Sequence, residues 1–328
     1  MSTLLEKVVL TPEEERKKYR NQKIATKFAS IGYKIFRFAL LFGLCFVLLY
    51  PLLYMISMSF RPLDQIYDPA VIWIPKSLTL QNFKDVMDPL AMDYWNSLKT
   101  SLLVNVVSSL MQVLATCFVG YGLARFKFRG KGLMFALVVF SAIVPPQLTI
   151  IPMYLQYKSF DPLGIFTLIT GAPINLLDSV WTFFLPAILG VGLNASLFIF
   201  IFRQFFAGLP KELEDSAAID GCGFFKTFIR IMIPNAGSVF LTAIILSIVW
   251  YWNDYNLGMM FFTNHKTVMT ALVELEAGLF KLDTSFDPYR HYTRMQAGSL
   301  LAIAPVVLMY IVLQKYFISG VERSGIVG

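Results

Sequence analysis

Charged residues are scarce in this chain. Asp, Glu, Lys and Arg make up 15% of its 328 residues, whereas hydrophobic residues make up 56% and the mean hydropathy is +0.62. An ordinary soluble domain carries about 25% charged residues. The shortage of charge therefore excludes a typical soluble globular protein and predicts a chain embedded in a membrane.

Cysteine and histidine are also rare. Cys45 and Cys117 fall in expected spans and Cys222 in an expected cytoplasmic loop, which predicts free thiols rather than disulfides. His265 and His291 have no neighbours at a metal-ligand spacing, so we expect no metal site. The sequence has no GxxxxGK[ST] pattern, so we expect this chain to bind neither ATP through such a loop nor any other cofactor.

Long uncharged runs are, by contrast, abundant. Six reach the ~20 residues that a helix needs to cross a bilayer. They are 38–60, 100–124, 132–157, 179–202, 231–253 and 295–314. Pro234 suits a helix entrance, so we expect the fifth span to begin late and to extend to about Phe262. The sequence thus predicts an all-α membrane protein with six transmembrane helices.

A seventh uncharged run, 162–177, is shorter than the others and contains two prolines and two glycines. This composition predicts an interfacial or re-entrant piece of an outer loop rather than a further span.

Lysine and arginine are distributed unevenly between the expected loops. With the N-terminus inside, the cytoplasmic segments hold 19 of the 28 basic residues. The positive-inside rule therefore places both termini in the cytoplasm and makes a nucleic-acid partner unnecessary as an explanation of the net charge of +7. The expected organisation is a basic cytoplasmic segment (1–37), a transmembrane domain (38–318) with a coupling loop (208–234) and an outer loop (263–294), and a cytoplasmic tail (319–328).

The segment before the first span is too long for a cleavable signal peptide, so the first helix is expected to remain as an anchor. Within this segment, Thr11-Pro12-Glu13 is a helix-opening signal and the residues after it turn basic, which predicts an amphipathic helix along the inner leaflet. A solvated helix and a regulatory contact are both compatible with the pattern.

The stretch ELEDSAAIDGCG (212–223) is a polar interruption of an apolar chain. Acidic residues follow Pro210, which favours the N-terminal end of a short helix, and Gly221 can supply the left-handed conformation that ends it. A second helix is expected to begin at Gly223 and to run into the fifth span at Pro234. The residues alone leave two interpretations open: a connector that needs a sharp turn, or a helix that enters a groove of another protein.

This stretch resembles the cytoplasmic EAA loop of bacterial ABC importer permeases, in which E-A-A-x-x-D-G is followed by I-x-L-P. Here Asp215-Ser216-Ala217, Asp220-Gly221 and 231–234 occupy those positions. Asp replaces the leading Glu, Ser the first Ala and Ile the Leu. The resemblance implies that Glu214, Asp215, Ser216, Ala217, Asp220 and Gly221 couple the chain to an ATPase.

Further stretches resemble the carbohydrate-uptake permeases of the maltose-transporter type, in particular the smaller six-span partner. They are 96–132, 144–154, FRQFFAGLPKEL, WYWNDY (250–255) and 297–320, and together they extend over nearly the whole chain from Phe36. Two features depart from the family: the ending 325–328 lacks the usual lysine, and the outer segment 158–178 is longer than expected.

The resemblance implies a type I ABC importer permease with a cytoplasmic coupling helix at about 211–219 and no catalytic chemistry of its own. The implied partners are a second permease subunit, two ABC ATPase subunits that bind ATP and Mg, an extracytoplasmic sugar-binding protein and the lipid bilayer. ATP-driven closure of the ATPases would rotate the spans through differential contacts with the coupling helix.

Residues of the translocation pathway are expected near the outer half of the fifth span. An acid within a span usually faces a cavity, so we selected Trp252, Asn253, Asp254 and Tyr255 there, together with Gln147 in the third span. An interfacial aromatic belt is the alternative for the cluster, and interhelical hydrogen bonding is the alternative for Gln147 and Gln112.

The outer loop 263–294 is expected, by resemblance, to reach into the binding protein, and a plain solvated loop is the alternative. For the whole chain the sequence favours a sugar importer. An ABC importer of another solute, a self-sufficient secondary transporter and a membrane enzyme are the alternatives. The sequence contains no internal repeat and no cluster of acids and histidines within the spans, which argues against the last two.

Overall fold

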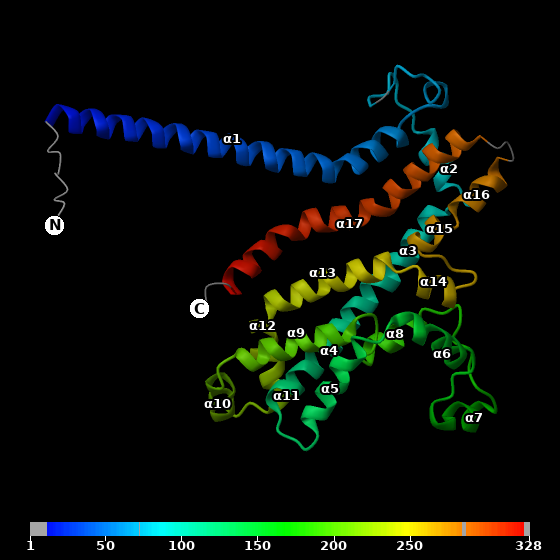
Figure 1. Cartoon of the computed structure of the whole chain (residues 1–328). Helices are drawn as coiled ribbons and strands as arrows, with labels where there is room; N and C mark the ends of the chain where they lie inside the picture. Colours follow the sequence, from blue (N-terminus) through cyan, green and yellow to red (C-terminus); the bar gives the residue numbers. More distant parts are fainter. Residues whose placement is uncertain (1–11, 72, 284–286, 325–328) are drawn as a thin grey trace, which may run out of the picture. The chain divides into compact units, whose positions relative to one another are not determined.

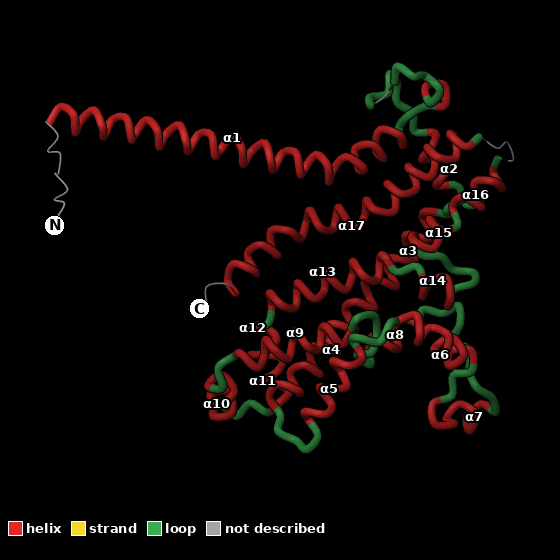
Figure 2. Tube along the Cα trace, viewed as in Figure 1, coloured by secondary structure: helices red, strands yellow, loops and turns green. Residues whose placement is uncertain are grey.

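The computed structural model describes residues 12–71, 73–283 and 287–324, and these residues are predominantly helical (Figures 1 and 2). Their one β pairing is an isolated bridge between Phe160 and Ile174. The chain divides into two units, 1–57 and 58–328, and each is described by itself. The unusual ending at 325–328 and the start of the basic N-terminal segment, 1–11, lie outside the described residues.

The first unit is formed by α1, which extends over Pro12–Ser59. We expected an amphipathic helix separate from the first span, and this expectation was wrong, because the two are one helix. No proline occurs between Pro12 and Pro51, so nothing in this stretch removes a backbone hydrogen bond and breaks the helix. Residues 29–59 of α1 are long and apolar enough to cross a membrane.

The second unit consists of short and long helices joined by brief connections (Figure 1). Its α-helices are α2 (Gln81–Met87), α3 (Tyr94–Ser101), α4 (Val107–Arg125), α5 (Lys131–Ser141), α6 (Pro146–Lys158), α7 (Ile165–Thr170), α8 (Trp181–Ile188), α9 (Ala195–Gly208), α10 (Glu212–Ile219), α11 (Phe224–Thr227), α12 (Ile233–Asn235), α13 (Gly237–Asn253), α14 (Asn256–Phe261), α15 (Val268–Val273), α16 (Leu275–Leu282) and α17 (Pro288–Ser324). Tighter 3₁₀ turns occur at Leu63–Gln65 and Pro162–Gly164, and wider π turns at Leu102–Val106 and Phe228–Met232.

All six predicted spans are helical, but only some are continuous. Among the described residues, 29–59, 94–125 and 289–314 are single helices long enough to cross a membrane. The third span is a pair, α5 and α6, bent by 100°, and the fifth is a pair, 224–235 and α13, bent by 78°. The fourth run is divided into α8 and the short apolar helix α9.

The third and fourth predicted spans are therefore interrupted, which the uncharged runs by themselves did not indicate. Pro145 and Pro146 lie at the break between α5 and α6, where proline cannot donate a backbone hydrogen bond. Gly190, with φ +69°, and Gly192 lie in the break between α8 and α9. Both breaks fall near the middle of their uncharged runs.

The fifth span also ends earlier than we expected. Helix α13 stops at Asn253 rather than continuing to about Phe262. Asp254 has an extended backbone, and its side chain accepts a hydrogen bond from the Leu257 N–H at 3.0 Å, at the start of α14. An aspartate that bonds nearby backbone in this way competes with the helix and ends it.

Helix α4 is the centre of the second unit. It packs along α9 and also contacts α8 and α13, while α13 contacts α17 (Figure 1). The interface contains the fully buried side chains Val113 and Cys117 from α4 and Phe198, Phe202 and Phe206 from α9. A movement of α4 should therefore displace the helices packed against it, α8, α9 and α13, because close-packed side chains transmit strain.

The segment 263–294, expected to be a loop, is largely helical. It contains α15, α16 and the first turns of α17, and its apolar residues Val268, Leu275 and Leu279 are fully buried. Arg294 is buried as well and is paired with Asp85 of α2, with 2.5 Å between its Nη2 and Oδ2. The alternative of a plain solvated loop was wrong, because apolar residues at helical spacing bury one face.

The run 162–177 forms the short helix α7, and its large side chains Leu163, Leu168 and Ile169 are exposed. The bridge between Phe160 and Ile174 closes this segment at its base. Exposed apolar side chains in this short segment agree with the predicted interfacial location. The position of the segment 162–177 in a membrane stays a prediction.

Asp178 bonds the end of this segment to residues 263–265, which follow α14. Its carboxylate accepts hydrogen bonds from the backbone N–H groups of Thr263, Asn264 and His265, at 2.9, 3.0 and 3.4 Å, and from the Asn264 amide at 2.6 Å. Burial raises the pKa of this carboxyl, but the hydrogen bonds outweigh burial and lower the pKa to about 2. The charged form is thus the one that the fold stabilises.

Replacing Asp178 with alanine should lower the thermal unfolding midpoint, because several donors lose their acceptor at a cost of about 1–3 kcal/mol. Asn264→Ala, which removes one of the four bonds, should have a smaller effect. In the unaltered protein this contribution is present above pH ~4 and should be lost as the pH falls toward about 2. Equal midpoints for the three proteins would contradict this account.

Candidate functional site

Two places in the second unit combine polar groups with unusual backbone. The first is the turn around α10, and the second is a cavity between the broken third and fourth spans. Figure 1 shows α10 at one end of α9 and the break that leads into α9 at the other end.

Helix α10 ends in a glycine turn with satisfied backbone groups. The Cys222 N–H donates to the Ala217 carbonyl at 2.8 Å, and the Gly221 N–H donates to the Ala218 carbonyl at 3.0 Å. Gly221 has φ +72°. These bonds and this dihedral define a Schellman motif. The predicted helix, the glycine turn and the second helix starting at Phe224 are all present.

The faces of α10 differ in exposure. Ala217 is buried against the rest of the unit, whereas Asp215, Ser216 and Asp220 are exposed. Ile219, at the tip, is 87% exposed. Three acidic residues occupy the first turn, at the positive end of the helix dipole.

Glu214 points in the opposite direction from its neighbour Asp215. The Tyr121 hydroxyl donates to Glu214 Oε1 at 2.7 Å, and Arg125 Nε lies 3.5 Å from Glu214 Oε2. Arg125 also donates from Nη2 to the Leu209 carbonyl at 2.7 Å, just before α10 begins. The predicted coupling residues are therefore of three kinds: Asp215, Ser216, Asp220 and Gly221 are exposed, Ala217 is buried, and Glu214 is bonded to α4.

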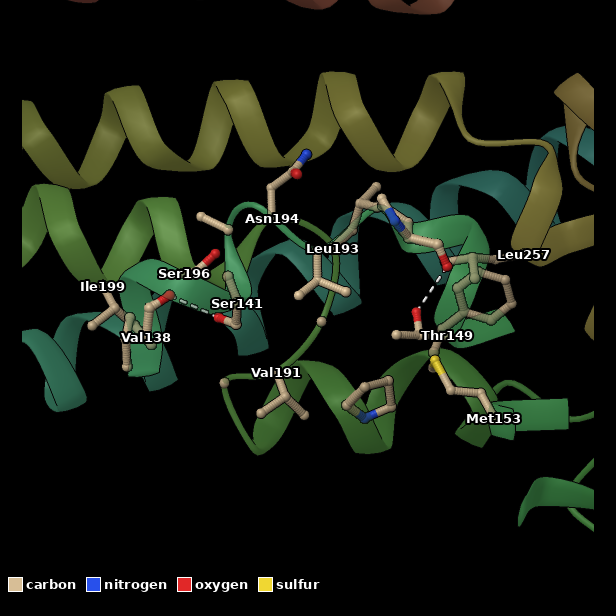
Figure 3. A pocket seen from close by; sticks show the side chains of 18 of the residues that line it. Val138, Ser141, Thr149, Met153, Val191, Leu193, Asn194, Ser196, Ile199 and Leu257 are labelled. Carbon is tan, nitrogen blue, oxygen red and sulfur yellow. Dashed lines mark hydrogen bonds between the residues drawn. The ribbon is translucent and has the colours of Figure 1, made fainter. Parts of the chain in front are cut away.

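The second place is a cavity of about 520 Å³ bounded by both broken spans (Figure 3). One wall comes from α5, α6 and the break between them, and the other from α8, α9 and the break that contains Gly192. Tyr251 of α13 and Leu257 of α14 complete the lining. Irregular backbone at membrane depth is tolerated where it is buried in protein or lines a cavity, and here it does both.

The cavity wall is apolar with a few hydrogen-bonding groups, and none of its lining residues is charged. Ser141 and Thr149 donate their hydroxyl protons to backbone carbonyls of their own helices, as Figure 3 shows. Within the described residues, no protein group bonds the Asn194 amide or the Ser196 hydroxyl. These two side chains are therefore polar groups of the lining that could bond a ligand. Asn194 has φ +55°, an uncommon dihedral that places it at the start of α9.

A buried hydrogen-bond network holds the break between α8 and α9 in place. Gln112 of α4 donates from Nε2 to the Leu193 carbonyl at 2.6 Å. The Tyr251 hydroxyl donates to Gln112 Oε1 at 2.7 Å and accepts from the Leu193 N–H at 3.3 Å. Both backbone groups of Leu193 are thus satisfied without water, as buried backbone requires. The side chain of Gln112 therefore makes interhelical hydrogen bonds, which was one of the roles that the sequence left open for it.

The predicted pathway residues do not gather around this cavity. Trp252 is buried against α17 and donates its indole N–H to the Ala302 carbonyl at 3.0 Å. Asn253, Tyr255 and Gln147 are exposed, and the Asp254 carboxylate accepts a hydrogen bond from the Leu257 N–H in the first turn of α14. None of the five lines the cavity, although their neighbours Tyr251 and Leu257 do.

Asn194, Ser196 and Tyr251 were not selected from the sequence. The signal that points to them is the pair Gly190 and Gly192 inside an otherwise apolar run, which interrupts a helix at mid-membrane depth. Among the described residues, no three Asp, Glu, His or Cys side chains are placed to hold a metal ion.

Apolar helices, a cavity between broken spans and a protruding helical turn together define a membrane-embedded transport subunit. The comparison with known families agrees. The chain belongs to the family described as the binding-protein-dependent transport system inner membrane component, whose model matches residues 112–323.

Several relatives are transport permeases named for sugars. The chain is 30% identical to the arabinooligosaccharides transport system permease protein AraQ of Halalkalibacterium halodurans, over 87% of this chain and 93% of that protein. It is 26% identical to the melibiose/raffinose/stachyose import permease protein MelC of Bacillus subtilis, over 78% of this chain and 84% of that protein. A chain in the crystal structure of a bacterial ABC transporter that imports the acidic polysaccharide alginate has the same fold, with a TM-score of 0.67 at 21% identity, over 87% of this chain and 96% of that chain.

Proposed function

We propose that this chain is one of two permease subunits of an ATP-driven importer for a sugar or oligosaccharide. The observation that carries this proposal is the exposed turn of α10, in which a helix with a Schellman end presents Asp215, Ser216 and Asp220. Membership of the binding-protein-dependent family and the sugars named for the relatives support it.

The distribution of basic residues supports an orientation with α10 and both chain ends in the cytoplasm. In that orientation the exposed side of α10 is offered to an ATPase subunit. Asp215 would pair with a basic residue of the ATPase, and Ile219 would fill an apolar part of its cleft. ATP and Mg would bind to the ATPase, so this chain itself would not be an enzyme.

The cavity between the broken spans is the proposed place where this subunit meets the solute. Ligand sites are commonly apolar with a few well-placed polar groups, and sites in transporters often lie at helix breaks near the bilayer midplane. The absence of charge among the lining residues suits a neutral sugar better than an acidic one. Asn253, Asp254, Tyr255 and Gln147 remain proposed pathway residues outside this cavity. Trp252, which is packed within the chain, is proposed to support them.

The experiment that tests this function is recovery of the partners. The tagged chain is purified from its native membrane in mild detergent, and the accompanying proteins are identified by mass spectrometry. We expect a second permease and an ATPase. Asp215→Lys should lose at least about nine tenths of the ATPase, because a like charge then faces the proposed basic partner.

Glu212→Lys is the matched control, because Glu212 is also an exposed acid in the first turn of α10. It should retain the ATPase. Equal loss in both variants would contradict the assignment of Asp215. Recovery of the unaltered chain alone, with solute transport in vesicles that contain no ATP, would contradict the importer itself and favour a secondary transporter.

A further inference from the structure

Glu214 and Asp215 are adjacent acids of α10 that make different contacts. Asp215 is exposed, whereas 24% of the Glu214 side chain is exposed and both its oxygens face groups on α4. A residue that contacts an ATPase must present its charge to the outside. The Glu214 carboxylate instead contacts Tyr121 and Arg125 of the same chain.

Arg125, the last residue of α4, contacts both the segment before α10 and the first turn of α10. Its side chain is 7% exposed, and it bonds the Leu209 carbonyl before α10 as well as facing the Glu214 carboxylate. The Glu214 carboxylate is the acidic group that this nearly buried guanidinium faces, and their attraction favours the observed position of Glu214. The entry to α10 and its first turn are therefore both attached to α4.

Tyr121 makes the contact rigid. Tyr121 is 2% exposed, and its ring stacks against Phe224, with 5.4 Å between centroids, and against Phe228, at 5.0 Å. The hydroxyl cannot swing away from Glu214 without disturbing these rings. Hence α4 is also fixed to α11, which follows the Gly221 turn.

Helix α4 leads from this contact to the cavity. Gln112, which holds Leu193 in the cavity wall, lies nine positions before Tyr121 on the same helix, roughly 13 Å along its axis. A displacement of α10 that moves α4 as a rigid rod would thus move the residue that fixes the break between α8 and α9. The two sites are thus physically connected through one rigid helix.

We infer that Tyr121, Arg125 and Glu214 form a clamp that transmits the displacement of α10 to α4, and that Glu214 acts within this chain rather than on the ATPase. The inference rests on the proposed function, because it assumes that an ATPase moves α10. These three side chains are positioning residues: they act on the cavity through α4 and do not touch the solute.

The test uses the complete complex, purified with its ATPase and reconstituted in nanodiscs. Spin labels at Leu114 of α4 and Leu308 of α17, both exposed, report the distance between the two helices with and without Mg·ATP. Glu214→Gln and Tyr121→Phe should keep the ATPase bound but lose at least about half of the ATP-dependent distance change. Tyr121→Phe removes one hydroxyl and keeps the stacked ring, so it changes the clamp with little effect on packing.

Two variants separate this clamp from contact with the ATPase. Glu212→Gln makes the same chemical change as Glu214→Gln at an exposed position of the same helix and should keep the full distance change. Asp215→Asn should instead weaken retention of the ATPase. Loss of the ATPase from Glu214→Gln, or a full distance change in Tyr121→Phe, would overturn the clamp alone. An unaltered complex that lacks an ATPase, or shows no response to Mg·ATP, would overturn the clamp and the proposed function together.

Discussion

Gly192→Ala is expected to abolish transport and to destabilise the purified chain. A Cβ atom at this position would lie 2.3 Å from Gln112 Oε1 and 2.4 Å from the Tyr251 hydroxyl. Both atoms are ends of side chains, which elsewhere could move at little cost. Here both are buried and bonded to each other and to Leu193, so moving them breaks the network that holds the cavity wall.

The expected cost is large because two effects combine. Overpacking a well-packed site costs about 1–3 kcal/mol. Each buried polar group left without its partner adds about 1–3 kcal/mol. A total of several kcal/mol is a large part of the stability of a typical protein. The break between α8 and α9 should then lose its fixed geometry.

The measurement is the thermal unfolding midpoint in detergent together with uptake by reconstituted vesicles. Val191→Ala is the matched control, because Val191 is an exposed neighbour and the substitution adds no atom. It should unfold at nearly the wild-type temperature. A Gly192→Ala protein with unchanged midpoint and uptake would show that Gln112 and Tyr251 can move freely and that the network does not hold the wall.

Gly221→Val is expected to uncouple ATP hydrolysis from transport. Gly221 has φ +72°, and a Cβ atom there would meet nothing within 4 Å. The effect of a substitution is therefore backbone strain alone. The left-handed conformation costs roughly 1–2 kcal/mol for an ordinary residue, and a β-branched side chain raises the cost further. The Schellman bonds at the end of α10 should break, and the exposed residues should lose their positions.

Gly221→Asn separates strain from the loss of glycine itself. Asparagine adopts the left-handed region more readily than valine, so it should retain most of the coupling. The readouts are ATPase retention, ATP hydrolysis and solute uptake by the reconstituted complex. Wild-type coupling in the valine variant would contradict the role of this turn. Equal loss in both variants would indicate that bulk, rather than the dihedral, is what the site excludes.

The α10 turn shows how much a local pattern can determine. Its acidic start, its glycine end and the restart of the helix after Gly223 were all readable from ELEDSAAIDGCG, because helix capping depends on residues within a few positions of each other. The direction in which each acid points was not readable. Glu214 and Asp215 are equivalent in the local pattern, and only Tyr121 and Arg125, about 90 positions earlier, distinguish them.

The membrane spans also divide into what the sequence predicts and what it does not. Uncharged runs predicted six spans, and the described residues contain three single helices and two bent helix pairs long enough to cross a membrane. Such runs are readable because the cost of burying charge in a bilayer depends on composition and length. The uncharged runs did not predict the breaks in the third and fourth spans. A glycine or proline in an apolar run can lie within a continuous helix or end it, and the run itself does not distinguish the two. In the fourth span, Gln112 and Tyr251 stabilise the break next to Gly192, because they supply the hydrogen bonds that the interrupted backbone needs.

The sequence by itself determined the class of protein, the helical spans and the presence of a capped helical turn, because hydropathy and capping are local properties. The tertiary structure alone decided where the cavity lies, which acid of α10 is bonded to α4, and that the segment 263–294 packs as helices. Those features depend on contacts between residues far apart in the chain. Such contacts are set by the packing of whole helices, and no short pattern specifies them.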